Sequence, residues 1–164
     1  MPASPTRVYL AGPLGFSELG RLGLAKLADL LGQSGYVVVD PFALTPQEDI
    51  DRVSRLPSLE AQRDAWRTLS LEIGRANREA IDACDLIVAV LDGPDVDSGA
   101  AAEIGYAFAR GKRIVGYRGD FRLAADNIGS TVNLQVEYFI RASGGEIASS
   151  LSELMSALHV HGGG

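Results

Sequence analysis

Short apolar runs alternate with stretches of helical periodicity along most of the chain. The longest run, over residues 85–91, is continuously apolar after its first residue, which is typical of a strand buried on both faces of a parallel sheet. Three shorter runs, rich in apolar and β-branched residues, also predict strands. These strands lie at 7–11, 36–39 and 113–117. Between the runs, apolar residues recur at helical spacing and predict helices. These helices cover 17–35, 60–83 and 100–110.

The pattern is weaker in three places. The segment 43–59 is polar, contains two prolines and lacks a clear period, so it predicts a long loop with at most a helical turn. The pattern over 60–83 fits either one helix or two helices broken near Gly74. After the last predicted strand a loop precedes two further helices, which are predicted at 133–142 and 146–158.

The alternation of strands and helices predicts an α/β fold. Right-handed crossovers then give an open parallel sheet of four or five strands with helices on both faces, a flavodoxin-like or Rossmann-like three-layer sandwich. We expect one domain over 1–164, with flexible termini at 1–6 and 159–164. Ligands of such sheets bind at the carboxyl ends of the strands, where the strand order reverses. The segments that follow the strands are 9–16, 40–42, 92–99 and 117–119.

Composition narrows the kind of protein. The 164 residues are 46% hydrophobic, which is enough for a sizeable core, and 15 basic against 21 acidic residues give a net charge of −6. This charge argues against a nucleic-acid partner, because such binding rests on neutralising phosphates. No apolar stretch approaches a membrane span and no leader is evident, so we expect a cytoplasmic protein without a membrane partner.

Several cofactor classes are also disfavoured. Cys84 is the only cysteine, which excludes an internal disulfide and a thiolate metal cluster. The two histidines, His159 and His161, lie in the tail, and no glycine-rich loop with Lys-Ser or Lys-Thr is present. We therefore expect no metal, no cofactor and no ATP dependence.

An isolated carboxylate marks the most unusual helix. Glu103 is the only charged residue between Gly99 and Arg110, in a segment that is otherwise small and apolar. Such a carboxylate either faces a cavity or is a partly exposed residue paired with an arginine. Gly99, four residues earlier, leaves open space above the carboxylate on the same helical face. Asp97, just before this helix, either caps its free N–H groups or contacts a ligand.

Four segments together resemble the nucleoside 2-deoxyribosyltransferase family. They are Tyr9-Leu-Ala-Gly-Pro13, Asp85-Leu-Ile-Val-Ala-Val, the block from Asp97 through Glu103 to Ala107, and Asn133-Leu. The resemblance implies that Glu103 attacks the anomeric carbon of a 2'-deoxynucleoside, releases the base and holds the sugar as a covalent ester. A second base then takes the sugar with net retention, as in a retaining glycosidase whose acceptor is a base in place of water.

The same resemblance implies roles for other residues. By this resemblance Tyr9 positions the nucleophile, Asp97 binds the sugar 5'-hydroxyl, and Asn133 comes from a neighbouring subunit of a homo-oligomer. From the residues alone, Tyr9 either reaches the crevice from the end of the first strand or is a buried tyrosine that hydrogen-bonds elsewhere. Gly12 shapes the loop after the first strand for close approach of a ligand. On that loop Phe16 either stacks on the base or covers the core. The implied partners are 2'-deoxynucleosides and free purine or pyrimidine bases.

The chain departs from the family at the residue expected to protonate the leaving base. Asn77 stands where the family carries an aspartate, and an amide hydrogen-bonds a base edge but cannot donate and recover that proton. Asp40 and Asp92 end the second and third predicted strands and are alternative acids, although each is equally well explained as a turn former or cap.

Two rival functions remain open. A nucleoside or deoxynucleoside 5'-monophosphate N-glycosidase would use the same glutamate with water as acceptor, although Asp95 and Asp97 would repel a phosphate and favour free nucleosides. A non-catalytic nucleotide-binding sensor is compatible with the same fold, because a fold does not fix a function.

Overall fold

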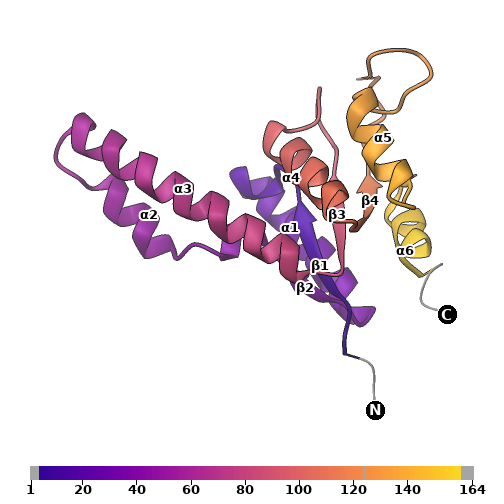
Figure 1. Ribbon diagram of the computed structural model, residues 1–164, viewed down its shortest axis with the longest axis horizontal. Coiled ribbons are helices and arrows are strands. Elements are labelled where there is room, and N and C mark those ends of the chain that lie inside the picture. The colour runs from indigo at the N-terminus through magenta and orange to yellow at the C-terminus, as the bar shows by residue number, and fades with distance from the viewer. Residues whose placement is uncertain (1–3, 124, 160–164) are drawn as a thin grey trace.

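A parallel sheet of five strands forms the centre of the molecule (Figure 1). The computed structural model describes residues 4–123 and 125–159. The strands are β1 (Arg7–Ala11), β2 (Val37–Val39), β3 (Leu86–Val90), β4 (Arg113–Tyr117) and β5 (Ile147–Ala148). Their order is β2-β1-β3-β4-β5, with every neighbouring pair parallel. The predicted α/β fold with an open parallel sheet is therefore confirmed, and the strand order reverses between β1 and β3.

Helices cover both faces of the sheet. One face carries α1 (Glu18–Gln33) and α6 (Leu151–His159), and the other carries the end of α3 (Leu59–Ala83), α4 (Ser98–Ala109) and α5 (Leu134–Ala142). Successive side chains of a strand point to opposite faces, so β1 sends Val8 towards α1 and Tyr9 towards α4. All five residues of β3 are buried, as its continuous apolar run predicts.

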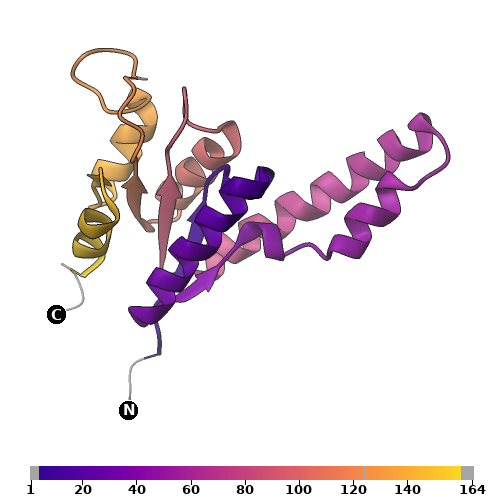
Figure 2. The ribbon, with the colours of Figure 1, turned by 180° about the vertical axis from the view of Figure 1, so that it is seen from behind.

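A helical hairpin projects away from the sheet. It consists of α2 (Gln47–Ser54) and the first part of α3, and both views show it extending well beyond the layers (Figures 1 and 2). The expectation of a loop over 43–59 was wrong for the segment that forms α2. This helix is short and polar, with Ile50 and Val53 as its inward apolar residues, so it carries little helical signal. The helix α3 is continuous through Gly74, so the segment forms one helix and not two. No helix of the described residues has the length and apolar character needed to cross a bilayer.

The C-terminal part differs from the expected single helix over 146–158. Its first residues instead form β5, a strand of two residues, and α6 then ends at His159. Gly145 permits this approach, because a Cβ there would lie 1.7 Å from the backbone oxygen of Ile114. Of the termini expected to be flexible, residues 1–3 and 160–164, including His161, lie outside the described residues.

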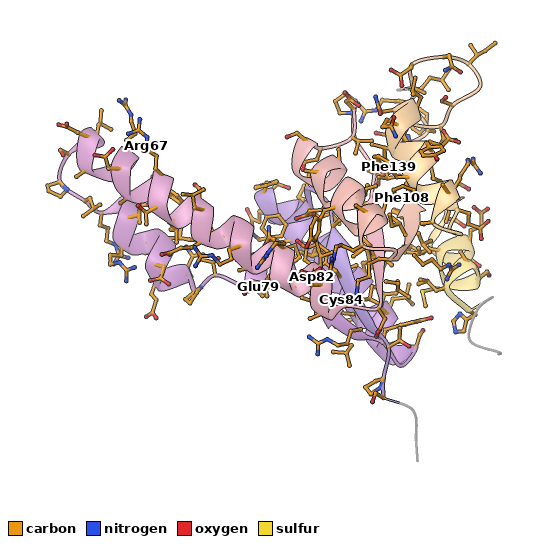
Figure 3. All side chains as sticks on the ribbon, in the orientation of Figure 1. Arg67, Glu79, Asp82, Cys84, Phe108 and Phe139 are labelled. Carbon is orange, nitrogen blue, oxygen red and sulfur yellow. The ribbon has the colours of Figure 1, made fainter. Side chains whose placement is uncertain are left out.

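A polar cluster joins the end of α3 to α4. The Asp82 carboxylate accepts hydrogen bonds from the Tyr106 hydroxyl and from Arg110 Nε at 2.8 Å. The Lys112 ammonium donates to the backbone oxygens of Asp82 and Cys84, which lie together at the end of α3 (Figure 3). These contacts fix the relative position of the two helices that carry Asn77 and Glu103.

Candidate active site

A cavity of about 390 Å³ lies beside the carboxyl ends of β1 and β3, where the strand order reverses. Its walls come from the glycine loop after β1 with the start of α1, from the segment after β2, and from α3 and α4. It is lined by Gly12, Gly15, Phe16, Arg21, Pro41, Phe42, Thr45, Ile50, Ile73, Asn77, Asp97, Gly99, Ala100 and Glu103. Its position agrees with the general rule for open parallel sheets.

One oxygen of the Glu103 carboxylate is held by two donors. The hydroxyl of Tyr9, a fully buried residue of β1, donates to Glu103 Oε1 at 2.6 Å. The Asn77 Nδ2 group, from α3, approaches the same oxygen at 3.4 Å. Among the described residues no donor reaches Glu103 Oε2. The carboxylate is therefore oriented through one oxygen while the other is available for a ligand.

Burial shifts the protonation of this pair. Removal from water raises the pKa of Glu103, the Tyr9 hydrogen bond opposes the rise, and the charge of Asp97 adds to it. Burial, together with the hydrogen bond to Glu103, also raises the pKa of Tyr9 far above its ordinary value. Tyr9 therefore stays a neutral donor, and Glu103 is the group of the pair that titrates.

Asn77 leaves an unsatisfied acceptor beside this pair. With Nδ2 turned to Glu103, the Asn77 Oδ1 atom is buried and has no hydrogen-bond partner among the described residues. An unpaired buried acceptor costs about 1–3 kcal/mol, so a polar group brought in by a ligand would relieve it.

Asp97 both caps α4 and lines the cavity. Its Oδ2 atom accepts from the backbone N–H of Ala100 at 3.0 Å, which satisfies one free donor of the helix. A Cβ on Gly99 would lie 3.0 Å from the same Asp97 oxygen, so glycine keeps this side of the cavity open. The two possibilities considered for Asp97 from sequence, a cap or a ligand contact, are therefore compatible.

The loop after β1 needs its glycines for two separate reasons. Gly12 has a φ of +144°, and a Cβ there would lie 2.9 Å from that of Val90. Gly15 lies directly under the Phe42 ring, whose atoms would be 2.2 Å from an added Cβ. The Phe42 ring also meets Phe16 edge to face, with centroids 5.0 Å apart. Close backbone approach thus builds an aromatic wall at this end of the cavity.

We expect Gly15→Ala to lower the free energy of unfolding by about 1–3 kcal/mol, because the Phe42 ring must move out of its packed position. Gly23→Ala is the matched control, since an added Cβ meets nothing within 4 Å at that position in α1. The control should gain about 0.5–1 kcal/mol from the better helix propensity of alanine. Urea unfolding measures both. Equal changes in the two variants would contradict the proposed packing of Phe42 on Gly15.

Three of the residues considered for substrate binding lie outside this cavity. Asp40 caps the short 3-10 helix η2 (Pro41–Ala43) through its Oδ1 atom, which accepts from Phe42 N at 2.9 Å. Asn133 caps α5 by accepting from the N–H groups of Gln135 and Val136. Asp92 accepts from the backbone N–H of Asp120 at 2.9 Å. Each side chain thus accepts from backbone N–H groups, and none of the three lines the cavity.

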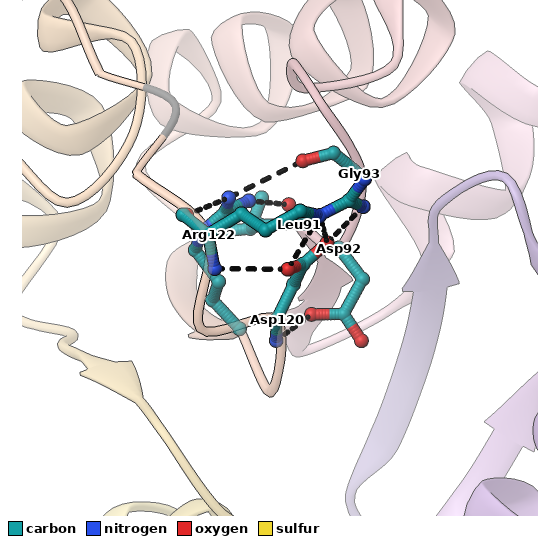
Figure 4. A network of polar contacts seen from close by, with 6 residues as sticks. Leu91, Asp92, Gly93, Asp120 and Arg122 are labelled. Carbon is teal, nitrogen blue, oxygen red and sulfur yellow. Dashed lines mark hydrogen bonds and ion pairs between the residues drawn. The ribbon is translucent and has the colours of Figure 1, made fainter.

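Asp92 belongs to a network that fixes the loop after β4 (Figure 4). The buried Arg118 donates to the backbone oxygens of Leu91, Gly93 and Arg122. The Asp120 carboxylate binds the Arg122 guanidinium in turn. The network holds two strand ends together and directs the Asp92 carboxylate towards the loop after β4.

Sequence reasoning missed part of the lining. Arg21, Thr45, Ile50 and Ile73 were not singled out, although Phe42 fell in a segment expected at the crevice. Ile50 was missed because it lies on α2, a helix that the sequence pattern does not predict. Arg21 was missed because its position in the sequence is typical of a surface residue of α1. The sequence-selected residues that do come together in the cavity are Gly12, Phe16, Asn77, Asp97, Gly99 and Glu103, with Tyr9 bonded to the last of them.

Comparison with known proteins identifies one family for this chain. A family model described as nucleoside 2-deoxyribosyltransferase matches residues 8–139. The uncharacterized protein C191.05c of Schizosaccharomyces pombe is 32% identical over 127 residues, which are 75% of this chain and 54% of that protein. The chain thus spans about half the length of this curated relative.

Two solved structures share the fold at low identity. The 2-desoxiribosyltransferase from Leishmania mexicana has a TM-score of 0.66 and 23% identity, over 96% of this chain and 99% of that one. The CMP N-glycosidase BcmB of Clostridium botulinum has a TM-score of 0.56 and 20% identity, over 95% and 100% of the two chains. The fold is therefore shared by a transferase and a hydrolase.

Proposed function

Because the chain belongs to the nucleoside 2-deoxyribosyltransferase family, we propose that it exchanges the base of a 2'-deoxynucleoside through a covalent ester with Glu103. The observation that carries the proposal is the half-buried Glu103 carboxylate, which lines a cavity of about 390 Å³ and has one oxygen held by Tyr9 and Asn77 and the other without a donor among the described residues. A helix that is otherwise small and apolar rarely places an unpaired carboxylate there for stability alone.

The proposed chemistry divides a difficult displacement into two steps. Glu103 Oε2 forms a bond to the anomeric carbon as the bond from that carbon to the base nitrogen breaks, and the base leaves with the electron pair and takes up a proton from water. A nitrogen of the second base then attacks the same carbon and gives up its proton to water, the ester bond breaks, and the carboxylate is restored. Two inversions give net retention, as for a retaining glycosidase.

Other cavity residues have supporting roles in this proposal. Tyr9 keeps Glu103 aligned, and Phe16 covers a face of the base. Asp97 accepts a hydrogen bond from the sugar 5'-hydroxyl in addition to the backbone N–H that it caps. Asn133 acts from a neighbouring subunit of a homo-oligomer, a role compatible with its position on the surface end of α5. Free nucleosides are favoured over nucleotides, because the Asp97 carboxylate at the cavity would repel a phosphate.

The proposal is tested by incubating deoxyinosine with adenine and measuring deoxyadenosine by liquid chromatography. Formation of deoxyadenosine that depends on both compounds supports transfer. Release of hypoxanthine and deoxyribose alone would contradict transfer and favour the N-glycosidase alternative. Binding of deoxyinosine without any cleavage would contradict both and favour a sensor.

We expect Tyr9→Phe to lower kcat/KM at neutral pH roughly tenfold, the worth of one hydrogen bond to a charged group. The bond from Tyr9 lowers the pKa of Glu103, so its loss raises that pKa further. Because the reaction needs the ionised carboxylate, the acidic limb of the pH profile should move to higher pH. Tyr36→Phe is the matched control, since Tyr36 precedes β2 and does not line the cavity. An acidic limb that stays in place in Tyr9→Phe would contradict the positioning role.

A further inference from the structure

Arg21 is the one basic side chain that lines the cavity within residues 4–123 and 125–159. Its Nε atom donates to the backbone oxygen of Gly15 at 2.9 Å, which anchors the guanidinium to the glycine loop after β1. No hydrogen bond or ion pair to the described residues engages its two terminal nitrogens. Arg21 therefore presents an anchored and unoccupied pair of donors at the cavity.

Arg21 lies on the side of the cavity that Phe42 and Ile50 form. It shares a second, smaller hollow with these two side chains, which Asp40 and Gln47 also line. The two carboxylates of the cavity, Asp97 and Glu103, come instead from α4 and the residue that caps it. If Glu103 attacks the sugar, as the proposed function holds, the planar base extends towards the aromatic side and its edge meets Arg21.

The chemistry of a guanidinium restricts which base edge fits. It has only donors, held in a planar fork that matches two neighbouring acceptors. A 6-oxopurine presents two such acceptors, O6 and N7, side by side, whereas adenine places an amino donor at the position of O6. We propose that Arg21 reads this edge and selects 6-oxopurines, hypoxanthine and guanine, over adenine.

A phosphate would also suit a guanidinium, but the charge distribution favours the base edge. A 5'-phosphate is attached to the sugar, and the sugar end of the cavity carries the Asp97 and Glu103 carboxylates. Repulsion there opposes a phosphate, while the Phe42 ring and Ile50 beside Arg21 suit a planar ring.

The test compares kcat/KM for deoxyinosine and deoxyadenosine, with cytosine as the common acceptor, in the wild-type protein and two variants. Arg21→Met keeps the length of the side chain and removes every donor, and Arg21→Lys keeps the charge and removes the fork. Arg67→Met is the matched control, because Arg67 lies on the outer part of α3 and outside this cavity (Figure 3). We expect the wild-type protein to prefer deoxyinosine about tenfold. Arg21→Met should bring the ratio of the two kcat/KM values to about one by a larger loss with deoxyinosine than with deoxyadenosine, Arg21→Lys should retain part of the preference, and Arg67→Met should leave the ratio unchanged.

Several results would overturn the inference. These are a wild-type protein without the preference, an equal loss for both nucleosides in Arg21→Met, and an effect confined to substrates with a 5'-phosphate. Calorimetric binding of free hypoxanthine and adenine gives a second readout that needs no turnover. Selective binding of hypoxanthine without cleavage of any nucleoside would contradict the proposed function and leave the role of Arg21 supported.

Discussion

Replacement of Glu103 by glutamine is expected to lower transfer activity by roughly 10⁴-fold or more, the scale on which removal of a nucleophile acts. Glutamine preserves the shape of the side chain and an oxygen that accepts from Tyr9, so the cavity should persist. What disappears is the ionised oxygen that forms the ester. Steady-state assays of base exchange measure the loss.

The stability of Glu103→Gln separates this loss from unfolding. The pKa of Glu103 is raised in the folded protein, so the folded state binds a proton more readily than the unfolded one, and stability falls as pH rises through that pKa. Glutamine carries no charge, so its burial does not cost the free energy that burial of the ionised Glu103 carboxylate costs. The variant should therefore unfold at a higher temperature than wild type at neutral pH, and the difference should vanish below the ordinary value of 4.5.

The covalent intermediate gives an independent readout. Wild-type protein quenched in acid after mixing with a deoxynucleoside should carry one deoxyribosyl unit on the peptide that contains Glu103, and Glu103→Gln should not. Full activity in Glu103→Gln, or an adduct on another peptide, would contradict the nucleophile assignment.

Asn77→Asp is expected to raise kcat by roughly 100-fold for bases that leave only when protonated, since a placed general acid contributes on that scale. Asn77 lines the cavity and lies 3.4 Å from Glu103 Oε1, so an aspartate there would sit beside a carboxylate. Two neighbouring carboxylates raise the pKa of the pair, which would keep one proton available near neutral pH. The variant should also gain a descending alkaline limb in its pH profile, as that proton is lost.

The leaving group provides the control for this gain. A deoxyriboside with a phenolate leaving group of low pKa needs no proton, so Asn77→Asp should not accelerate its cleavage. Asn77→Leu should lower the rate with both kinds of substrate, because it removes the donor to Glu103. No acceleration with any base would contradict the placement of residue 77 beside the leaving group.

Most of the fold follows from the apolar pattern, and the failures have a common cause. The continuous apolar run of β3 is typical of a buried strand, and the helical spacing of apolar residues in α1 is typical of a helix. The helix α2 and the strand β5 are so short that their sequences show no recognisable hydrophobic periodicity. Their conformations depend on packing against other elements, on α3 for the helix α2 and on β4 for Ile147.

The site divides in a similar way. Glu103 is conspicuous in sequence because the helix around it is apolar, and the structure indeed places it in the cavity. The rule for strand ends correctly locates the edge of the sheet but says nothing about side-chain direction. Asp40 and Asp92 lie at that edge, yet one oxygen of each accepts from a backbone N–H group, that of Phe42 for Asp40 and that of Asp120 for Asp92. Arg21 gives no sequence signal, because its place in the cavity depends on how the glycine loop folds beneath it.

The two sides of the cavity differ in how much they contribute to the buried core, and this difference affects which cavity residues can be substituted without loss of stability. The side around Glu103 consists of Tyr9 on β1, Asn77 on α3 and Glu103 on α4, elements that pack against the main core. The opposite side comes from short segments around η2 and α2 that contribute little to the buried core. Substitutions there can alter substrate range at small cost in stability, so this wall offers a natural starting point for directed evolution.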